Sequence, residues 1–161
     1  MKLNFYDIDN EYTNYLRKYD SKIPYINYDT KNKFLCGVVM TINNNNYYVP
    51  VSSNKNKFLS SFIIYDEKSD GQKIPTSSLR FSFMFPCPVE CISIKDIKKE
   101  IDTKYRILTQ KEYEYCNKHI DAIKKQAKKI YELANKENLR EKYNLCNFKF
   151  LEEKCNEYIK N

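Results

Sequence analysis

The chain has 161 residues, of which 42% are hydrophobic, and its 28 Lys and Arg outnumber its 21 Asp and Glu to give a net charge of +7. This length suits one core, so we expect residues 1–161 to form a single domain. The charge favours a polyanionic partner, either nucleic acid or an acidic membrane surface. With only 2 glycines, the chain has no glycine-rich phosphate loop of either common kind.

Targeting signals and metal-binding patterns are both missing from the sequence. No apolar run is long enough to span a bilayer, and the N-terminus is too acidic for a signal peptide. We therefore expect a cytoplasmic protein with no membrane partner and with reduced cysteines. Cys36, Cys116 and Cys155 lie in apolar patterns and are interpreted as core residues. No C-x-x-C pair occurs and His119 has no ligand-spaced partner, so we expect no metal and no cofactor.

The first part of the chain predicts one strand, one helix and a loop. Residues 3–8 favour an opening strand, and residues 9–19 favour a short helix with its tyrosines and Leu16 on one side. Residues 24–33 form a polar loop that contains tyrosines.

A β-hairpin is predicted next. Residues 34–42 are rich in β-branched side chains, which is typical of a strand. The asparagine run 43–46 is a turn signal, and residues 47–51 form the return strand.

Further strands and loops follow the hairpin. A polar loop over 52–56 leads to a strand over 58–65. A charged loop over 66–76 then precedes an alternating strand over 78–85, which residues 89–92 could continue.

Helical periodicity dominates the last third of the chain. Ser93 and Asp96 form a loose capping pattern before the apolar residues of a helical segment. The strongest pattern predicts one helix over 109–135, and a final helix follows Asn147. Strands followed by segregated helices indicate an α+β fold, a twisted antiparallel β-sheet with flanking helices.

The residue types present restrict the chemistry that the chain can perform. One histidine excludes a two-histidine acid–base pair within the chain, and no carboxylates are spaced as in a two-metal nuclease. Catalysis would have to use Ser, Thr, Tyr, Lys or Arg, or groups of the substrate. RNA supplies such a group, because its 2′-hydroxyl can attack the adjacent phosphate. The protein then needs only to orient the RNA, move protons and stabilise negative charge on phosphorus.

One end of the predicted hairpin gathers candidate catalytic residues. Ser52, Ser53 and Lys55 follow the return strand and place two hydroxyls and an ammonium at its end. Lys33 immediately precedes the partner strand, so antiparallel pairing should bring it near Val51, at the end of the hairpin that carries this loop. These groups could converge on a phosphate, although a solvated turn is the alternative for so short a motif.

Two further groups of residues could bind RNA. Tyr25 and Tyr28 could stack on splayed bases, or could pack the loop against the sheet. The lysines of the predicted helix 109–135 lie opposite its apolar stripe and could hold a phosphate backbone, or could form a solvated face. The candidates on this helix are Lys118, Lys125 and Lys129, with Lys124 and Lys128 beside them.

Four segments in order resemble the ToxN/AbiQ family of type III toxin–antitoxin endoribonucleases, which includes the CptN and TenpN branches. Residues 33–39 and 47–55 are similar to the central hairpin of the family and its hydroxyl–hydroxyl–x–lysine loop. Residues 79–86 resemble a later strand that ends in Met-x-Pro, and residues 146–154 resemble the terminal motif.

The resemblance implies both a fold and an activity. The fold would be distantly like that of the Kid/MazF toxins. The activity would be metal-independent cleavage of cellular or phage RNA to 2′,3′-cyclic phosphate and 5′-hydroxyl ends. The partner would be an antitoxin of repeated RNA pseudoknots in a closed multimeric toxin–RNA complex, with no protein cofactor. The biological outcome would be growth arrest or abortive phage infection.

The resemblance also implies roles for individual residues. Ser53 matches the key hydroxyl of the family and Ser52 the hydroxyl before it. Lys33 and Lys55 match its basic residues, and either would stabilise charge while Ser53 orients the phosphate or the 2′-hydroxyl. The general base stays unassigned. Tyr28 and, on the matching strand, Arg80 are expected to contact RNA.

Two other functions compete with an endoribonuclease. A non-catalytic RNA-binding module would use the same lysines and tyrosines, but it would not cut RNA in EDTA. A DNA-binding regulator would need a helix-turn-helix, which the late helices do not suggest. Tandem short repeats and a terminator just upstream of the gene would favour the toxin.

Overall fold

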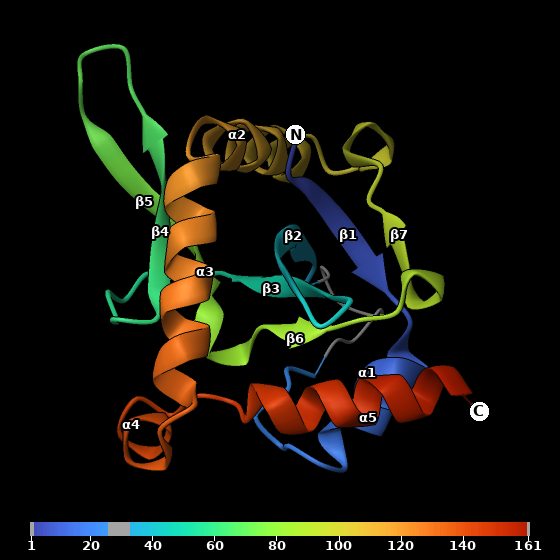
Figure 1. Cartoon of the computed structure of the whole chain (residues 1–161). Coiled ribbons are helices and arrows are strands. Elements are labelled where there is room, and N and C mark those ends of the chain that lie inside the picture. Colours follow the sequence, from blue (N-terminus) through green and yellow to red (C-terminus); the bar gives the residue numbers. More distant parts are fainter. Residues whose placement is uncertain (1, 26–32, 161) are drawn as a thin grey trace.

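A computed structural model describes residues 2–25 and 33–160, with the backbone alone for residues 159 and 160. Its centre is a seven-stranded sheet of order β4-β5-β3-β2-β1-β7, with β6 paired to β3 beside β5 (Figure 1). Every strand pair is antiparallel, which confirms the predicted α+β fold. The strands are β1 (Asn4–Ile8), β2 (Leu35–Ile42), β3 (Asn45–Ser52), β4 (Ser61–Glu67), β5 (Lys73–Arg80), β6 (Phe85–Pro86) and β7 (Ile92–Ile94).

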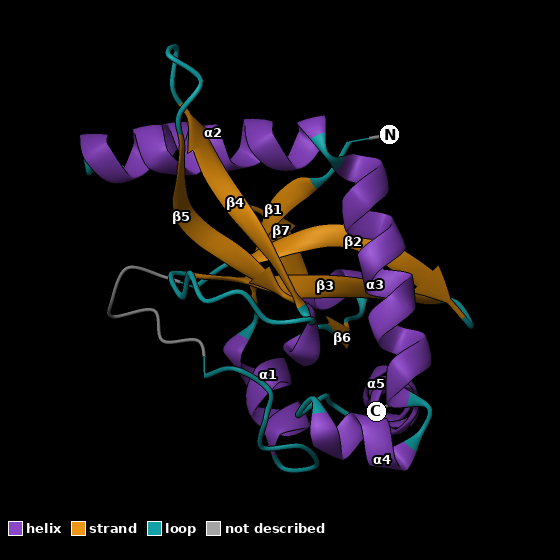
Figure 2. Cartoon of the chain, turned by 90° about the vertical axis from the view of Figure 1, so that its left-hand side faces the viewer, coloured by secondary structure: helices purple, strands orange, loops and turns teal. Residues whose placement is uncertain are grey.

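The helices surround this sheet. In both views α2 crosses one end of the molecule, α1 and α5 lie at the opposite end, and α3 runs between the two ends (Figures 1 and 2). Helix α2 packs against β4, α3 against β2, and α5 against β6. The bounds are α1 (Asn10–Arg17), α2 (Thr103–Lys118), α3 (Ile120–Ala134), α4 (Glu137–Lys142) and α5 (Phe148–Lys160), with 3₁₀ turns at Phe81–Phe83, Val89–Cys91 and Ile97–Lys99.

The predicted hairpin is present as β2 and β3. Asn43 and Asn44 form its tip with positive φ angles of 51° and 63°, a conformation that asparagine tolerates and that two-residue hairpin turns require. Leu35 pairs with Pro50, and the Val51 amide donates to the Phe34 carbonyl at 3.0 Å. This register extends the pairing to the start of β2 and sets Lys33 beside the end of β3.

The core fills the space between the sheet and the helices. Cys36, Cys116 and Cys155 are at most 2% exposed, so their interpretation as core residues is confirmed. Gly37 is required by close packing, because the ring of Tyr48 lies where a side chain at position 37 would begin.

The predicted helix 109–135 is wrong, because the structure has two helices there. Helix α2 ends at Lys118 and α3 begins at Ile120, with His119 between them at φ −123° and ψ 32°. The apolar stripe gives no sign of this break, since Cys116 and Ile123 are both buried on either side of it.

The later strand boundaries also differ from those predicted. Much of the expected loop 66–76 is strand, because β4 and β5 continue as an exposed hairpin that projects beyond the sheet (Figure 1). Their exposed ends lack the apolar alternation that marks a half-buried strand. The predicted strand 78–85 ends at Arg80, where a 3₁₀ turn interrupts it. Residues 58–60 precede β4, and α4 was not expected from the sequence.

Candidate active site

A pocket at the end of β3 gathers most of the predicted catalytic residues. This β3-end pocket has a volume of about 280 Å³. Lys33, Ser52 and Ser53 line it together, as the hairpin register predicts. The other lining residues are Phe34, Val51, Thr76, Ser77, Tyr105, Leu108 and Glu112.

Hydrogen bonds fix the loop that carries the two serines. The Asn54 amide donates to Ser52 Oγ at 3.1 Å, and the Asn56 amide donates to Asn54 Oδ1 at 2.9 Å. The Asn54 carbonyl accepts from Ser78 Oγ of β5 at 2.6 Å. These bonds anchor the loop to the neighbouring strand and leave Ser53 exposed at the mouth of the pocket.

Helix α2 contributes a carboxyl group that the sequence analysis missed. Glu112 lines the β3-end pocket although its residue is only 4% exposed, and Ser77 Oγ donates a hydrogen bond to its Oε2. Burial raises the pKa of this carboxyl, and the hydrogen bond from Ser77 partly opposes that rise. A signal was available, because Glu112 occupies a helical stripe with Thr109 and Cys116, where an apolar residue would be expected.

Tyr105 adds a phenol to the same pocket from the first turn of α2. Burial raises its pKa, and the nearby carboxyl of Glu112 raises it further. The phenol therefore stays neutral at physiological pH. The β3-end pocket thus combines hydroxyl donors, one ammonium group and one buried carboxyl.

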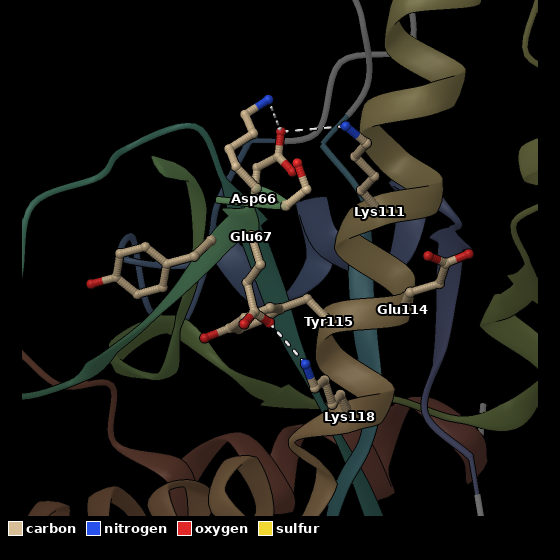
Figure 3. A pocket seen from close by; sticks show the side chains of 9 residues that line it. Asp66, Glu67, Lys111, Glu114, Tyr115 and Lys118 are labelled. Carbon is tan, nitrogen blue, oxygen red and sulfur yellow. Dashed lines mark hydrogen bonds and ion pairs between the residues drawn. The ribbon is translucent and has the colours of Figure 1, made fainter. Parts of the chain in front are cut away.

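A larger pocket, about 440 Å³ in volume, lies between β4 and α2, and its lysines are paired with the carboxylates of Asp66 and Glu67 (Figure 3). Lys111 Nζ lies 3.3 Å from Asp66 Oδ2, and Lys118 Nζ lies 3.1 Å from Glu67 Oε1. Hydrogen bonds from lysines lower the pKa values of both Asp66 and Glu67. Because these lysines already have partners, the smaller β3-end pocket is the better candidate for phosphate chemistry.

The predicted row of RNA-binding lysines is divided between two helices. Lys118 is on α2 in its ion pair with Glu67, whereas Lys125 and Lys129 are exposed on α3. Within the described part of the chain, Lys125 and Lys129 form no ion pair. The three lysines therefore do not form the single helical face that the sequence predicted.

Lys55 and Arg80 lie outside the lining of the β3-end pocket. Lys55 is exposed in the loop after β3. The guanidinium carbon of Arg80 lies 4.9 Å from the ring centre of Phe58 and 5.1 Å from that of Phe83. Arg80 is thus held between two aromatic rings, with burial lowering the pKa of its guanidinium.

The structure describes one of the two loop tyrosines. Tyr25 is 58% exposed, and the Arg17 guanidinium carbon lies 4.9 Å from its ring centre. Tyr28 lies outside the described residues. His119 does not line the β3-end pocket, and its ring stacks on Tyr115 at a centroid distance of 4.2 Å.

The described part of the chain contains neither a cluster of metal-ligating side chains nor a membrane-spanning helix. No three side chains of the His, Cys, Asp or Glu type in residues 2–25 and 33–158 gather closely enough to hold a metal ion. Over the same part of the chain, no helix has the length and apolar character needed to cross a membrane.

Comparison with known proteins gives consistent matches over nearly the whole chain. Residues 4–156 match the family described as "Toxin ToxN, type III toxin-antitoxin system". The chain is 31% identical to Endoribonuclease ToxN of Bacillus thuringiensis subsp. kurstaki, over 96% of this chain and 83% of that protein. It is 30% identical to Endoribonuclease AbiQ of Lactococcus lactis subsp. lactis, over 99% and 91% of the two chains.

Solved structures give the same result. One, described as concerning selective toxin inhibition by a non-coding RNA pseudoknot, superposes with a TM-score of 0.87 at 28% identity and full coverage of both chains. Another, of the lactococcal anti-phage endoribonuclease AbiQ, has a TM-score of 0.86 at 25% identity, also over both whole chains. The chain therefore belongs to the ToxN/AbiQ family of endoribonuclease toxins from type III toxin–antitoxin systems.

Proposed function

We propose that this single-domain toxin cuts RNA at the β3-end pocket by letting the ribose 2′-hydroxyl attack the adjacent phosphate. The observation that supports this proposal is the convergence of Lys33, Ser52 and Ser53 on one small pocket. Lys33 Nζ is the cation that neutralises the extra charge on phosphorus in the transition state. The hydroxyls of Ser52 and Ser53 donate to the non-bridging oxygens and orient the phosphate.

In this reaction the RNA itself supplies the nucleophile. The 2′-oxygen forms a bond to phosphorus and the bond to the 5′-oxygen breaks, which leaves a 2′,3′-cyclic phosphate and a 5′-hydroxyl. Because the ribose supplies the nucleophile and a lysine stabilises the charge, the mechanism is metal-independent. Lys55, exposed beside the pocket, attracts the RNA backbone toward it.

RNA is also the proposed inhibitor. A relative of this chain is described as inhibited by a non-coding RNA pseudoknot, which supports the same partner here. Lys125 and Lys129 on α3 are exposed cations that suit a phosphate backbone, and Tyr25 and Arg80 offer further contacts. Repeated pseudoknots would bind several toxin chains in one closed toxin–RNA complex in the cytoplasm. Toxin released from this complex would cut cellular or phage RNA.

Cleavage in the presence of EDTA tests the proposed activity. The purified protein should cut a mixed RNA pool in EDTA, and Ser53→Ala should slow cutting about 10- to 100-fold, because one hydrogen bond to the transition state is lost. Rates would be measured from end-labelled RNA under single-turnover conditions. Ser93→Ala is the control, since Ser93 is exposed on β7, away from the β3-end pocket. Intact RNA after incubation with folded wild-type protein would support a binding module instead.

A further inference from the structure

The proposed reaction needs a group that accepts a proton, and the β3-end pocket offers few. The hydroxyls in it are neutral donors, and a charged lysine has no lone pair to offer. Tyr105 has a raised pKa, so at neutral pH its phenol holds its proton. Among the described residues that line the pocket, Glu112 alone has a carboxyl group.

The position of Glu112 suits proton transfer. Ser77 Oγ holds Oε2, whereas Oε1 accepts no hydrogen bond from any described residue. Ser77 immediately precedes Ser78, and Ser78 pairs with Ser52 across β5 and β3. Strand β5 therefore holds both the Glu112 carboxyl and the serine loop. Both groups are thus held in fixed positions around a phosphate bound in the pocket.

We propose that Glu112 is the general base of the cleavage reaction, taking the proton from the 2′-hydroxyl that attacks phosphorus. This inference rests on the proposed function. The O2′–H bond breaks as the O2′–P bond forms, and the proton goes to the Glu112 carboxylate. The P–O5′ bond then breaks and the 5′-oxygen takes a proton from water. Glu112 returns its proton to solvent, so the carboxylate is restored for the next turnover.

Burial among the groups around Glu112 raises the pKa of its carboxyl. Tyr105 and Cys116 lie near it on α2, Ser77 of β5 donates to it, and Lys33 lines the same pocket. Cys36 of β2 lies beside Cys116 and remains a thiol. Burial raises the pKa of the Glu112 carboxyl, and a carboxylate with a raised pKa is a stronger base near neutral pH.

Single-turnover cleavage rates from about pH 5 to about pH 9 test the inference. In the wild type the rate should rise with pH through the pKa of Glu112 and then level off. Glu112→Gln should lower the plateau rate about 100-fold and abolish the rising limb. Ser77→Ala should move the limb to higher pH, because losing a donor to the carboxylate raises its pKa. Glu114→Gln, an exposed carboxyl on the same helix, should keep the wild-type profile.

A substrate with sulfur in place of the bridging 5′-oxygen separates the two possible proton transfers. A thiolate leaves without a proton, so this RNA would restore fast cutting by Glu112→Gln only if Glu112 protonated the leaving group. We expect no such restoration, and observing it would overturn the assignment of Glu112 as base.

Other outcomes bear on the inference in distinct ways. A Glu112→Gln protein that cuts at the wild-type rate, or cuts slowly but keeps the rising limb, would overturn it. If the rising part of the rate–pH profile of Ser77→Ala lay at the same pH as in the wild type, the inference would be overturned even if Glu112→Gln failed to fold. Measuring Ser53→Ala in the same assay distinguishes a wrong assignment of Glu112 from a wrong proposed function. Slow cutting by Ser53→Ala together with fast cutting by Glu112→Gln would reject only the role of Glu112 as general base. Wild-type rates in both variants would reject the β3-end pocket as the active site.

Discussion

Replacing Lys33 by methionine is expected to slow RNA cleavage about 1,000-fold while changing the free energy of unfolding by less than about 0.5 kcal/mol. Lys33 is exposed at the β3-end pocket and forms no ion pair with a described residue, so the fold does not depend on its charge. In the proposed transition state, its ammonium offsets a full negative charge in a partly enclosed site. Methionine keeps much of the apolar stem and removes only that charge.

Single-turnover rates and urea unfolding on the same preparations would check this result. Lys149→Met on α5 is the matched control, because it removes an exposed lysine at the opposite end of the molecule (Figure 1). Lys55→Met should cost less than Lys33→Met, since Lys55 does not line the pocket. An equal or greater loss in Lys55→Met would mean that the transition-state cation has been assigned to the wrong lysine.

Replacing Glu152 by leucine is expected to reduce the free energy of unfolding by about 3–5 kcal/mol. Glu152 is 6% exposed on α5, and its Oε2 accepts from Tyr47 at 2.5 Å and from Tyr131 at 2.8 Å. Its Oε1 accepts from Asn43 Nδ2 at 3.2 Å. One carboxylate thus ties together the central hairpin, α3 and the last helix. Leucine would remove the acceptor of the Tyr131 phenol and leave the Tyr47 phenol only the Phe148 carbonyl, at 3.4 Å.

Urea unfolding of Glu152→Leu, Glu152→Gln and Glu153→Gln would measure this effect. Glutamine retains one carbonyl acceptor, so about 1–2 kcal/mol should be lost. Glu153 is exposed on the next position of α5, and its replacement should change little. A Glu152→Leu protein as stable as the wild type would show that the cluster contributes nothing to stability.

The hairpin end was predictable because its signals are local. A β-branched strand followed by asparagines specifies β2, its turn and β3, and antiparallel pairing then places Lys33 at the hairpin end that carries the serine loop. The break at His119 was not predictable in the same way. Neither glycine nor proline marks it, and the apolar stripe continues across it from α2 to α3.

The rest of the pocket depends on contacts that are distant in sequence. Ser77 lies between the expected charged loop 66–76 and the expected strand 78–85, and only the long β4–β5 hairpin makes it a buried strand residue. Glu112 reaches the pocket because α2 packs across β4, which sequence periodicity does not specify. A carboxylate in a buried helical stripe was the one available signal, and its partner could not be identified before the sheet was known.

The most direct test of the account uses an RNA oligonucleotide with a 2′-deoxyribose at one cutting site, incubated with the protein in EDTA. Mass spectrometry of the fragments should show 2′,3′-cyclic phosphate and 5′-hydroxyl ends at every ribose site that is cut. The bond after the deoxyribose should stay intact, because its nucleophile has been removed. Cutting at that bond, or fragments with 5′-phosphate ends, would contradict attack by the 2′-hydroxyl.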